Sequence, residues 1–147
     1  MLPKWHILFA FLFAYILYWF TSMTIIDASL IFLSSVLIDF DHYFWYGFKK
    51  KDWSLKNSYI YLKKHRDIYK PLMLFHTIEF HIFIGLLIFF FQGFLYILIG
   101  MMFHSVLDIT DMAYRNKLGL REFSLVRYLI LKNKKKDSIF NIEIYLS

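Results

Sequence analysis

Histidine and carboxylate side chains recur in three short motifs at the ends of apolar runs. In chain order these residues are Asp39, Asp41 and His42, then His76 and Glu79, then His104 and Asp108. Histidine nitrogens and carboxylate oxygens are the atoms that proteins without cysteine offer to divalent metal ions. Ionisable residues within apolar segments are costly, and they mark functional positions by default. The sequence therefore predicts a metal site assembled from three separate segments.

The spacing within each motif supports convergence. His104 and Asp108 are four residues apart and His76 and Glu79 three apart, so each pair shares a helix face. The two aspartates on either side of Phe40 end an apolar run, where a turn would direct both carboxylates inward. Such a cluster of carboxylates repels itself unless a cation lies among them. The pair His104 and Asp108 taken alone is better explained by hydrogen bonding between helices, and each of the other motifs alone would equally fit a polar helix end or a hydrogen-bonded pair.

Three further residues are candidates for supporting positions. His81 follows His76 by five residues, so it leans toward another face and is either a residue behind the ligands or a satisfied core histidine. Asp111 follows Asp108 by three residues and could join the site or cap the helix end. His6 could reach the site, but anchoring at a membrane interface is the simpler interpretation.

The composition predicts a membrane protein with an all-α fold. Hydrophobic residues make up 59% of the 147 residues, 22% are aromatic, and the mean hydropathy is +0.50. A soluble domain of this size could not bury 18 phenylalanines. The absence of cysteine excludes disulfides, thiolate metal sites and cysteine nucleophiles. Four apolar runs stand out, at 5–20, 24–38, 72–91 and 94–110.

The charge distribution predicts how these runs are oriented. The net charge is +6, and the basic residues lie at Lys4, in 43–71 and beyond 110, whereas the connections 21–23 and 92–93 carry none. By the positive-inside rule both termini lie in the cytoplasm, with a prokaryotic plasma membrane as the expected location. The basic segments are expected to contact membrane lipid through its anionic headgroups and not nucleic acid. No cleavage site of small residues follows the first run, so it is expected to remain as an anchor.

These observations predict an integral-membrane four-helix bundle over residues 1–112 and a basic cytoplasmic tail over 113–147. Between the second and third helices, a basic interfacial helix is expected over 52–70, with Asp52 capping its start. In this topology the end of the second run, the start of the third run and the second half of the fourth run all lie near the cytoplasmic boundary. The three motifs therefore reach a similar depth.

The motifs resemble those of the predicted membrane-bound metal-dependent hydrolases, which are distantly related to zinc-dependent phospholipase C and the single-strand-specific zinc nucleases. Many members carry Leu-Pro-Asp-x-Asp-His, then a His-rich motif, then Gly-x-x-x-His-x-x-x-Asp. Here Ile38 replaces the proline, and Gly100 precedes His104 by four residues. The resemblance covers about residues 25–112. It implies a helical fold, a site for two or three divalent ions, and hydrolase activity.

We therefore expect a divalent-metal-dependent hydrolase, phosphodiesterase- or phospholipase-like, that cleaves a phosphoester of a phospholipid or other amphiphile at the inner membrane face. Zinc is the expected metal, with manganese and magnesium as alternatives, and all seven motif residues are expected ligands. Glu79 is either a ligand or the general base. The alternatives are a metal or proton transporter or channel subunit, and a structural adaptor pinned by metal. A channel needs polar residues along its whole path, whereas polarity here is concentrated at one end.

Overall fold

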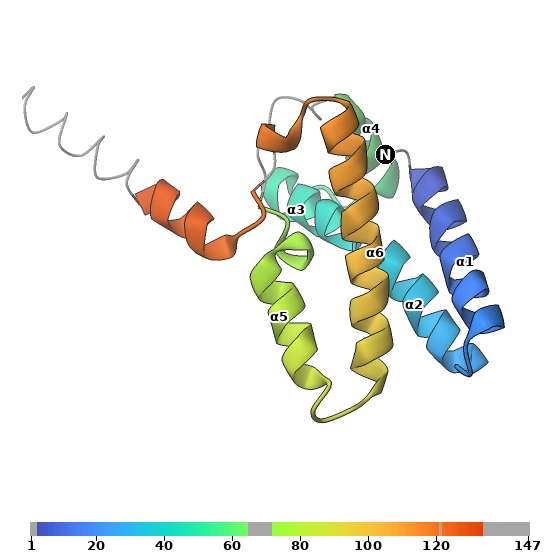
Figure 1. Cartoon of the computed structure of the whole chain (residues 1–147). Helices are drawn as coiled ribbons and strands as arrows, with labels where there is room; N and C mark the ends of the chain where they lie inside the picture. Colours follow the sequence, from blue (N-terminus) through green and yellow to red (C-terminus); the bar gives the residue numbers. More distant parts are fainter. Residues whose placement is uncertain (1–2, 65–71, 121, 134–147) are drawn as a thin grey trace, which may run out of the picture.

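The computed structural model describes residues 3–64, 72–120 and 122–133, and over these ranges the protein is all-α without strands (Figure 1). The α-helices are α1 (Pro3–Phe20), α2 (Ile25–Leu37), α3 (Phe40–Lys50), α4 (Leu55–Lys64), α5 (Ile78–Leu87) and α6 (Gly93–Tyr114). Two 3₁₀ turns, η1 (Leu74–His76) and η2 (Leu118–Leu120), join them. Residues 125–133 are also helical. The all-α class predicted from the sequence is confirmed.

Helix α6 lies at the centre of the molecule, in contact with α1, α2 and α5. In Figure 1 the helices α1 and α2 lie on one side of α6 and α5 on the other. The connections from α1 to α2 and from α5 to α6 both lie at the lower end, and α3 and α4 lie toward the upper end. The end of α2, the start of α5 and the second half of α6 are thereby brought together.

A close approach of α2 and α6 depends on Gly100. A Cβ atom at this position would overlap the carbonyl oxygen of Ile31 and the hydroxyl of Ser34. Small side chains also occupy the contacts of α1 and α2, where Ala14 and Ala28 are buried. This contact fixes where the second half of α6 lies relative to the end of α2.

The basic segment after α2 differs from the single helix predicted over 52–70. A turn after α2 starts α3 directly, and α4 follows as a separate helix. Asp52 does not cap α4, because the Ser54 hydroxyl accepts the N–H of Asn57 at 3.3 Å. Asp52 instead accepts the Ser54 N–H at 2.9 Å and the Tyr46 hydroxyl at 2.7 Å, which ties α3 to α4. The remainder of the predicted helix lies outside the described residues.

The third apolar run also differs from prediction, because its first residues are not α-helical. Met73 is extended, η1 follows, and α5 begins only after Thr77, whose hydroxyl accepts the N–H of Phe80 at 3.3 Å. Helix α5 has 10 residues, or about 15 Å at 1.5 Å per residue, half the thickness of a hydrocarbon core. The fourth run is longer than expected and continues to Tyr114.

Among the described residues, α6 is the one helix both long and apolar enough to cross a membrane. The apolar helices Lys4–Phe20 and Ile78–Leu87 are shorter. The core helix of a soluble protein can have the same length and composition as α6. The four full spans predicted from the sequence are therefore not shown by the helix lengths.

Candidate metal centre

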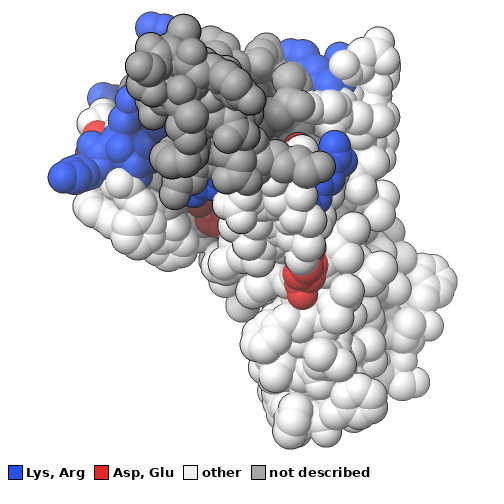
Figure 2. All heavy atoms as spheres, turned by 90° about the vertical axis from the view of Figure 1, so that its left-hand side faces the viewer, with Lys and Arg blue, Asp and Glu red and all other residues white. Residues whose placement is uncertain are grey.

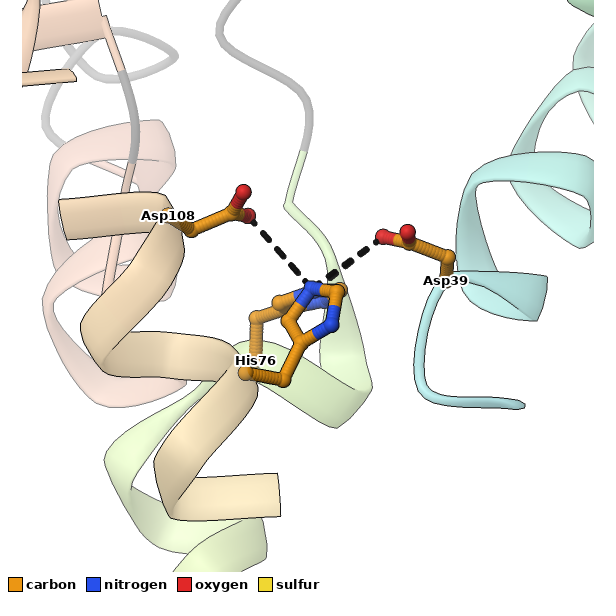
Figure 3. Close-up of side chains that lie close together, drawn as sticks. Asp39, His76 and Asp108 are labelled. Carbon is orange, nitrogen blue, oxygen red and sulfur yellow. Dashed lines mark hydrogen bonds and ion pairs between the residues drawn. The ribbon is translucent and has the colours of Figure 1, made fainter. Parts of the chain in front are cut away.

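Three elements supply the side chains of the candidate metal centre. Asp39 lies in the turn between α2 and α3, and His76 is the last residue of η1. His104 and Asp108 lie on consecutive turns of α6. Figure 3 shows Asp39 and Asp108 approaching His76 from opposite sides.

The distances between the four side chains suit one metal ion. The Nε2 atoms of His76 and His104 are 3.3 Å apart. One Asp39 oxygen lies 3.4 Å from the His104 Nε2 and 3.6 Å from the His76 Nε2, and one Asp108 oxygen lies 3.7 and 4.0 Å from the same atoms. Ligands about 2.0–2.1 Å from a tetrahedral zinc are about 3.3 Å from one another. The four ligand atoms, all within 4.8 Å of one another, thus leave a metal-sized position between them.

The hydrogen bonds of the two imidazole rings indicate that this position requires positive charge, from a bound metal ion or from protons on the two Nε2 atoms. The His104 Nδ1 lies 2.7 Å from the Ser35 carbonyl oxygen, which can only accept, so Nδ1 carries the proton. The His76 Nδ1 donates in the same way to an Asp41 carboxylate oxygen at 2.9 Å. If the rings are neutral, each Nε2 atom then carries a lone pair and no proton. Two lone pairs and two carboxylates would face one another, which is unfavourable without a positive charge between them.

Buried groups behind the four side chains hold them in place. The Asp41 oxygen that accepts from His76 also accepts the Phe75 N–H at 3.1 Å. The His6 Nε2 lies 3.2 Å from the second oxygen of Asp108, and its ring stacks on that of His104 with centroids 4.4 Å apart. Contacts of this kind orient metal-binding histidines and carboxylates in known metalloproteins.

The site opens to the exterior at Asp39. The side chains of His76 and His104 are 2% and 0% exposed, whereas that of Asp39 is 33% exposed. His42 lies at the same edge, 32% exposed, with its Nε2 3.5 Å from an Asp39 oxygen. Burial alone would raise the pKa of Asp39, but hydrogen bonds from His104 and His76, which form when their Nε2 atoms carry a proton and no metal is bound, hold that pKa well below its usual value.

A second group of ligand-type residues overlaps the first. Asp41, His42 and His76 also have ligand atoms within 4.8 Å of one another. His76 is common to both groups, and its Nδ1 is already bonded to Asp41. Asp41 is therefore better explained as the residue that orients His76 than as a ligand of a second ion.

Glu79, expected from the sequence to be a ligand or general base, has other partners. Its carboxylate accepts the Ser124 hydroxyl at 2.6 Å and the N–H groups of Leu125 and Val126 at 3.0 and 3.2 Å. These contacts cap the helical residues 125–133. Glu79 belongs to neither group of ligand-type residues found in the described part of the chain.

Two of the three residues considered for supporting positions, His81 and Asp111, also bond elsewhere. The His81 Nδ1 donates to the Thr77 carbonyl at 2.8 Å and its Nε2 accepts from the Ser105 hydroxyl at 3.2 Å, which joins α5 to α6. Asp111 pairs with Arg115 at 3.0 Å near the end of α6. His81 is thus a hydrogen-bonded histidine of the helix interface.

His6 is the one residue at the site that the sequence pattern did not favour. Its ring is buried beside Asp108 and His104, not at an interface. The only sequence signal was its place at the polar end of the first apolar run. Its contact with α6 is tertiary and spans about a hundred residues of chain, so spacing could not reveal it.

Comparison with known proteins adds no identity: no family model matches the chain, and no match was found among curated proteins or solved structures. The geometry of the site is therefore the basis for assigning a function.

Proposed function

We propose that the protein is a membrane-embedded, divalent-metal-dependent hydrolase that cleaves a phosphoester of an amphiphile. The observation that carries the proposal is the convergence of acceptor atoms from Asp39, His76, His104 and Asp108. Structural zinc sites are dominated by cysteine, whereas sites of histidine and carboxylate are typical of catalytic zinc. When bound, such an ion polarises a phosphoryl oxygen and lowers the pKa of a coordinated water toward about 7.

The residues of the chain would divide the remaining work. Asp39, His76, His104 and Asp108 would hold one ion, most simply zinc, with Asp41 and the Ser35 carbonyl orienting the two rings. His42 lies at the open edge beside Asp39, so its ring is placed to accept the proton of a water entering there. We assign this role to His42 in place of Glu79, whose carboxylate is occupied by the cap of residues 125–133.

The membrane location is supported by the large apolar side chains on the surface. Phe89 and Phe90 are 88% and 85% exposed, and Trp19 and Phe20 are 70% and 79% exposed. All four lie at the lower end of the molecule, next to the uncharged connections. Soluble monomers rarely expose extended apolar surface of this kind. Figure 2 shows lysine and arginine gathered toward the opposite end, where anionic headgroups would bind them.

A structural role for the metal is the second candidate, because four protein ligands can close a tetrahedral site. Closed four-coordinate sites stabilise the folded structure and leave no position for water or substrate. Against this, a third of the Asp39 side chain is exposed, and zinc in catalytic sites can expand to five ligands. The two candidates differ in whether the metal-loaded protein hydrolyses a phosphoester.

The test uses purified full-length protein, elemental analysis, and release of phosphorylated headgroup from vesicles of phosphatidylcholine and phosphatidylglycerol. We expect hydrolysis that chelation abolishes and zinc restores. His104→Ala should lose metal and activity together, whereas the control His81→Gln should keep both. Bound metal that raises the unfolding temperature in a protein that hydrolyses no phosphoester would overturn the hydrolase in favour of structural pinning.

The role of His42 is tested separately. His42→Gln should keep the metal and the fold while hydrolysis falls by about 10²-fold, since positioned proton transfer typically supplies that factor. Loss of the metal in His42→Gln would instead make His42 a ligand. Full activity in this variant would remove the proton-acceptor assignment.

A further inference from the structure

An apolar groove lies between α2 and α5, with α6 as its floor. Its volume is about 340 Å³, within the range of small-molecule pockets. The side chains that line most of it are Leu33 and Leu37 of α2, Phe80 and Ile84 of α5, and Ile97 and Met101 of α6. The one polar lining residue is Ser34, whose hydroxyl donates to the Ile31 carbonyl at 3.1 Å. The groove therefore suits a hydrocarbon ligand.

The upper end of the groove adjoins the candidate metal centre. Ile38 and Phe75 line it there, and each immediately precedes a proposed ligand, Asp39 and His76 respectively. The Phe75 N–H is also held by the Asp41 carboxylate that orients His76. The groove wall and the ligands are thus parts of the same two turns of chain.

Helix α6 joins the two sites along one face. Ile97, Met101, His104 and Asp108 follow one another at spacings of four, three and four residues, so they lie on consecutive turns of the same face. From Ile97 to His104 the helix rises about 10 Å. A molecule with its polar group among the ligands would direct its apolar part along this face into the groove.

The groove also has an open side. The α2 residues Leu33 and Leu37 are 47% and 48% exposed. No charged residue is among those that line it. A chain could therefore enter sideways from surrounding lipid without passing a charged group.

We propose that the groove binds one hydrocarbon chain of the substrate and so places the substrate's polar group at Asp39, His76, His104 and Asp108. This inference rests on the proposed hydrolase function, which identifies the phosphoester as the group that reacts. The groove then restricts the class of substrate. The substrate is a phosphoester on a long-chain lipid, and a water-soluble phosphoester lacks the part that the groove binds.

The experiment is photolabelling of full-length protein in detergent with a lysophospholipid that carries a diazirine in the middle of its chain. Labelled residues are identified by mass spectrometry, independently of hydrolysis. We expect label on the groove side chains of α2 and α6. Leu33→Trp, which fills the groove, should reduce this label about tenfold, as expected for overpacking a fitted site. The control Leu86→Trp makes the same change at an exposed position of α5 outside the groove.

Competition tests the two parts of the ligand. Unlabelled lysophospholipid should displace the probe, whereas glycerol phosphate, which has no chain, should not. Leu37→Trp repeats the test at the upper end if Leu33→Trp does not fold. Label spread evenly over exposed side chains of α1, or unchanged label in a folded groove variant, would overturn the groove assignment even in an active hydrolase. Specific groove label in a protein that hydrolyses no phosphoester would instead overturn the hydrolase and leave the groove in place.

Discussion

His76 is held at Nδ1 by Asp41, and its Nε2 faces the candidate metal position. The Asp41 carboxylate accepts the ring proton at 2.9 Å and is itself buried. A carboxylate in this position fixes the ring orientation and increases the basicity of the opposite nitrogen. Metal affinity should therefore depend on Asp41 although the ion does not touch it.

We predict that Asp41→Asn weakens metal binding by about 10–100-fold, the usual effect of removing a partner that orients a ligand. Metal affinity is measured by competition with a chelating dye. The matched control is Asp111→Asn. Asp111 lies on the same helix as His104, but it pairs with Arg115 and not with a proposed ligand. Equal affinities in wild type and Asp41→Asn would contradict the proposed orientation of His76.

Glu79, unlike Asp41, is expected to have no effect on metal binding. Because its carboxylate caps residues 125–133, Glu79→Gln should leave metal content unchanged and loosen that segment. Hydrogen exchange at Leu125 and Val126 should become several-fold faster, since their N–H groups lose a charged acceptor. Loss of metal in Glu79→Gln with unchanged exchange would restore Glu79 to the metal site.

At the scale of elements, the packing of α2 against α6 sets the geometry of the centre. We predict that Gly100→Ala destabilises the protein by about 1–3 kcal/mol, because the new Cβ would overlap backbone of α2 and force the helices apart. Gly85→Ala is the matched control: its Cβ would meet only a Leu98 side-chain atom at 3.8 Å. The control should be neutral or slightly stabilising, since alanine is the better helix former. Thermal unfolding measures both, and equal stabilities would mean that α2 and α6 are less closely packed.

The junction of α3 and α4 is expected to respond to acid. The N–H of Ser54, then the Asn57 amide and the Tyr46 hydroxyl, lower the pKa of Asp52. A carboxyl whose pKa is depressed by folding contributes stability above its unfolded value of about 3.9, and this contribution is lost as pH falls. Asp52→Asn should therefore reduce stability at pH 7 and remove part of the loss seen in wild type below about pH 4. Parallel stability curves for the two proteins in acid would contradict this.

The sequence predicted the helices and the shared helix faces that depend on local residue spacing. His104 and Asp108 share a face because both lie within one long helix, and the four apolar runs correspond to helices. The separate α3 was missed because Phe40–Lys50 follows α2 after a short turn that no glycine or proline marks, so its residues were divided between the apolar run and the basic connection. The partners of Glu79 and His6 could not be predicted, since each is a tertiary contact over more than forty residues.

Across the whole molecule, apolar surface, metal centre and basic segments follow one another along the length of the helices. The exposed aromatic residues Trp19, Phe20, Phe89 and Phe90 lie at the end with the uncharged connections, and lysine and arginine lie toward the other. The candidate centre lies between them, where α2 gives way to α3. A lipid substrate would meet this arrangement with its chain on the apolar side and its headgroup on the basic side.

The same arrangement predicts the orientation of the chain in a membrane. The protein has no cysteine, so single cysteines can be introduced into the full-length chain without a background. Ser22→Cys and Gln92→Cys lie in the exposed, uncharged connections, and Lys56→Cys lies on the basic helix α4. We expect a membrane-impermeant maleimide to label the first two in intact cells, and the third only after permeabilisation, because basic segments remain in the cytoplasm. Labelling of all three in the same cells, or recovery of the protein in the soluble fraction, would show that the hairpins do not cross the membrane.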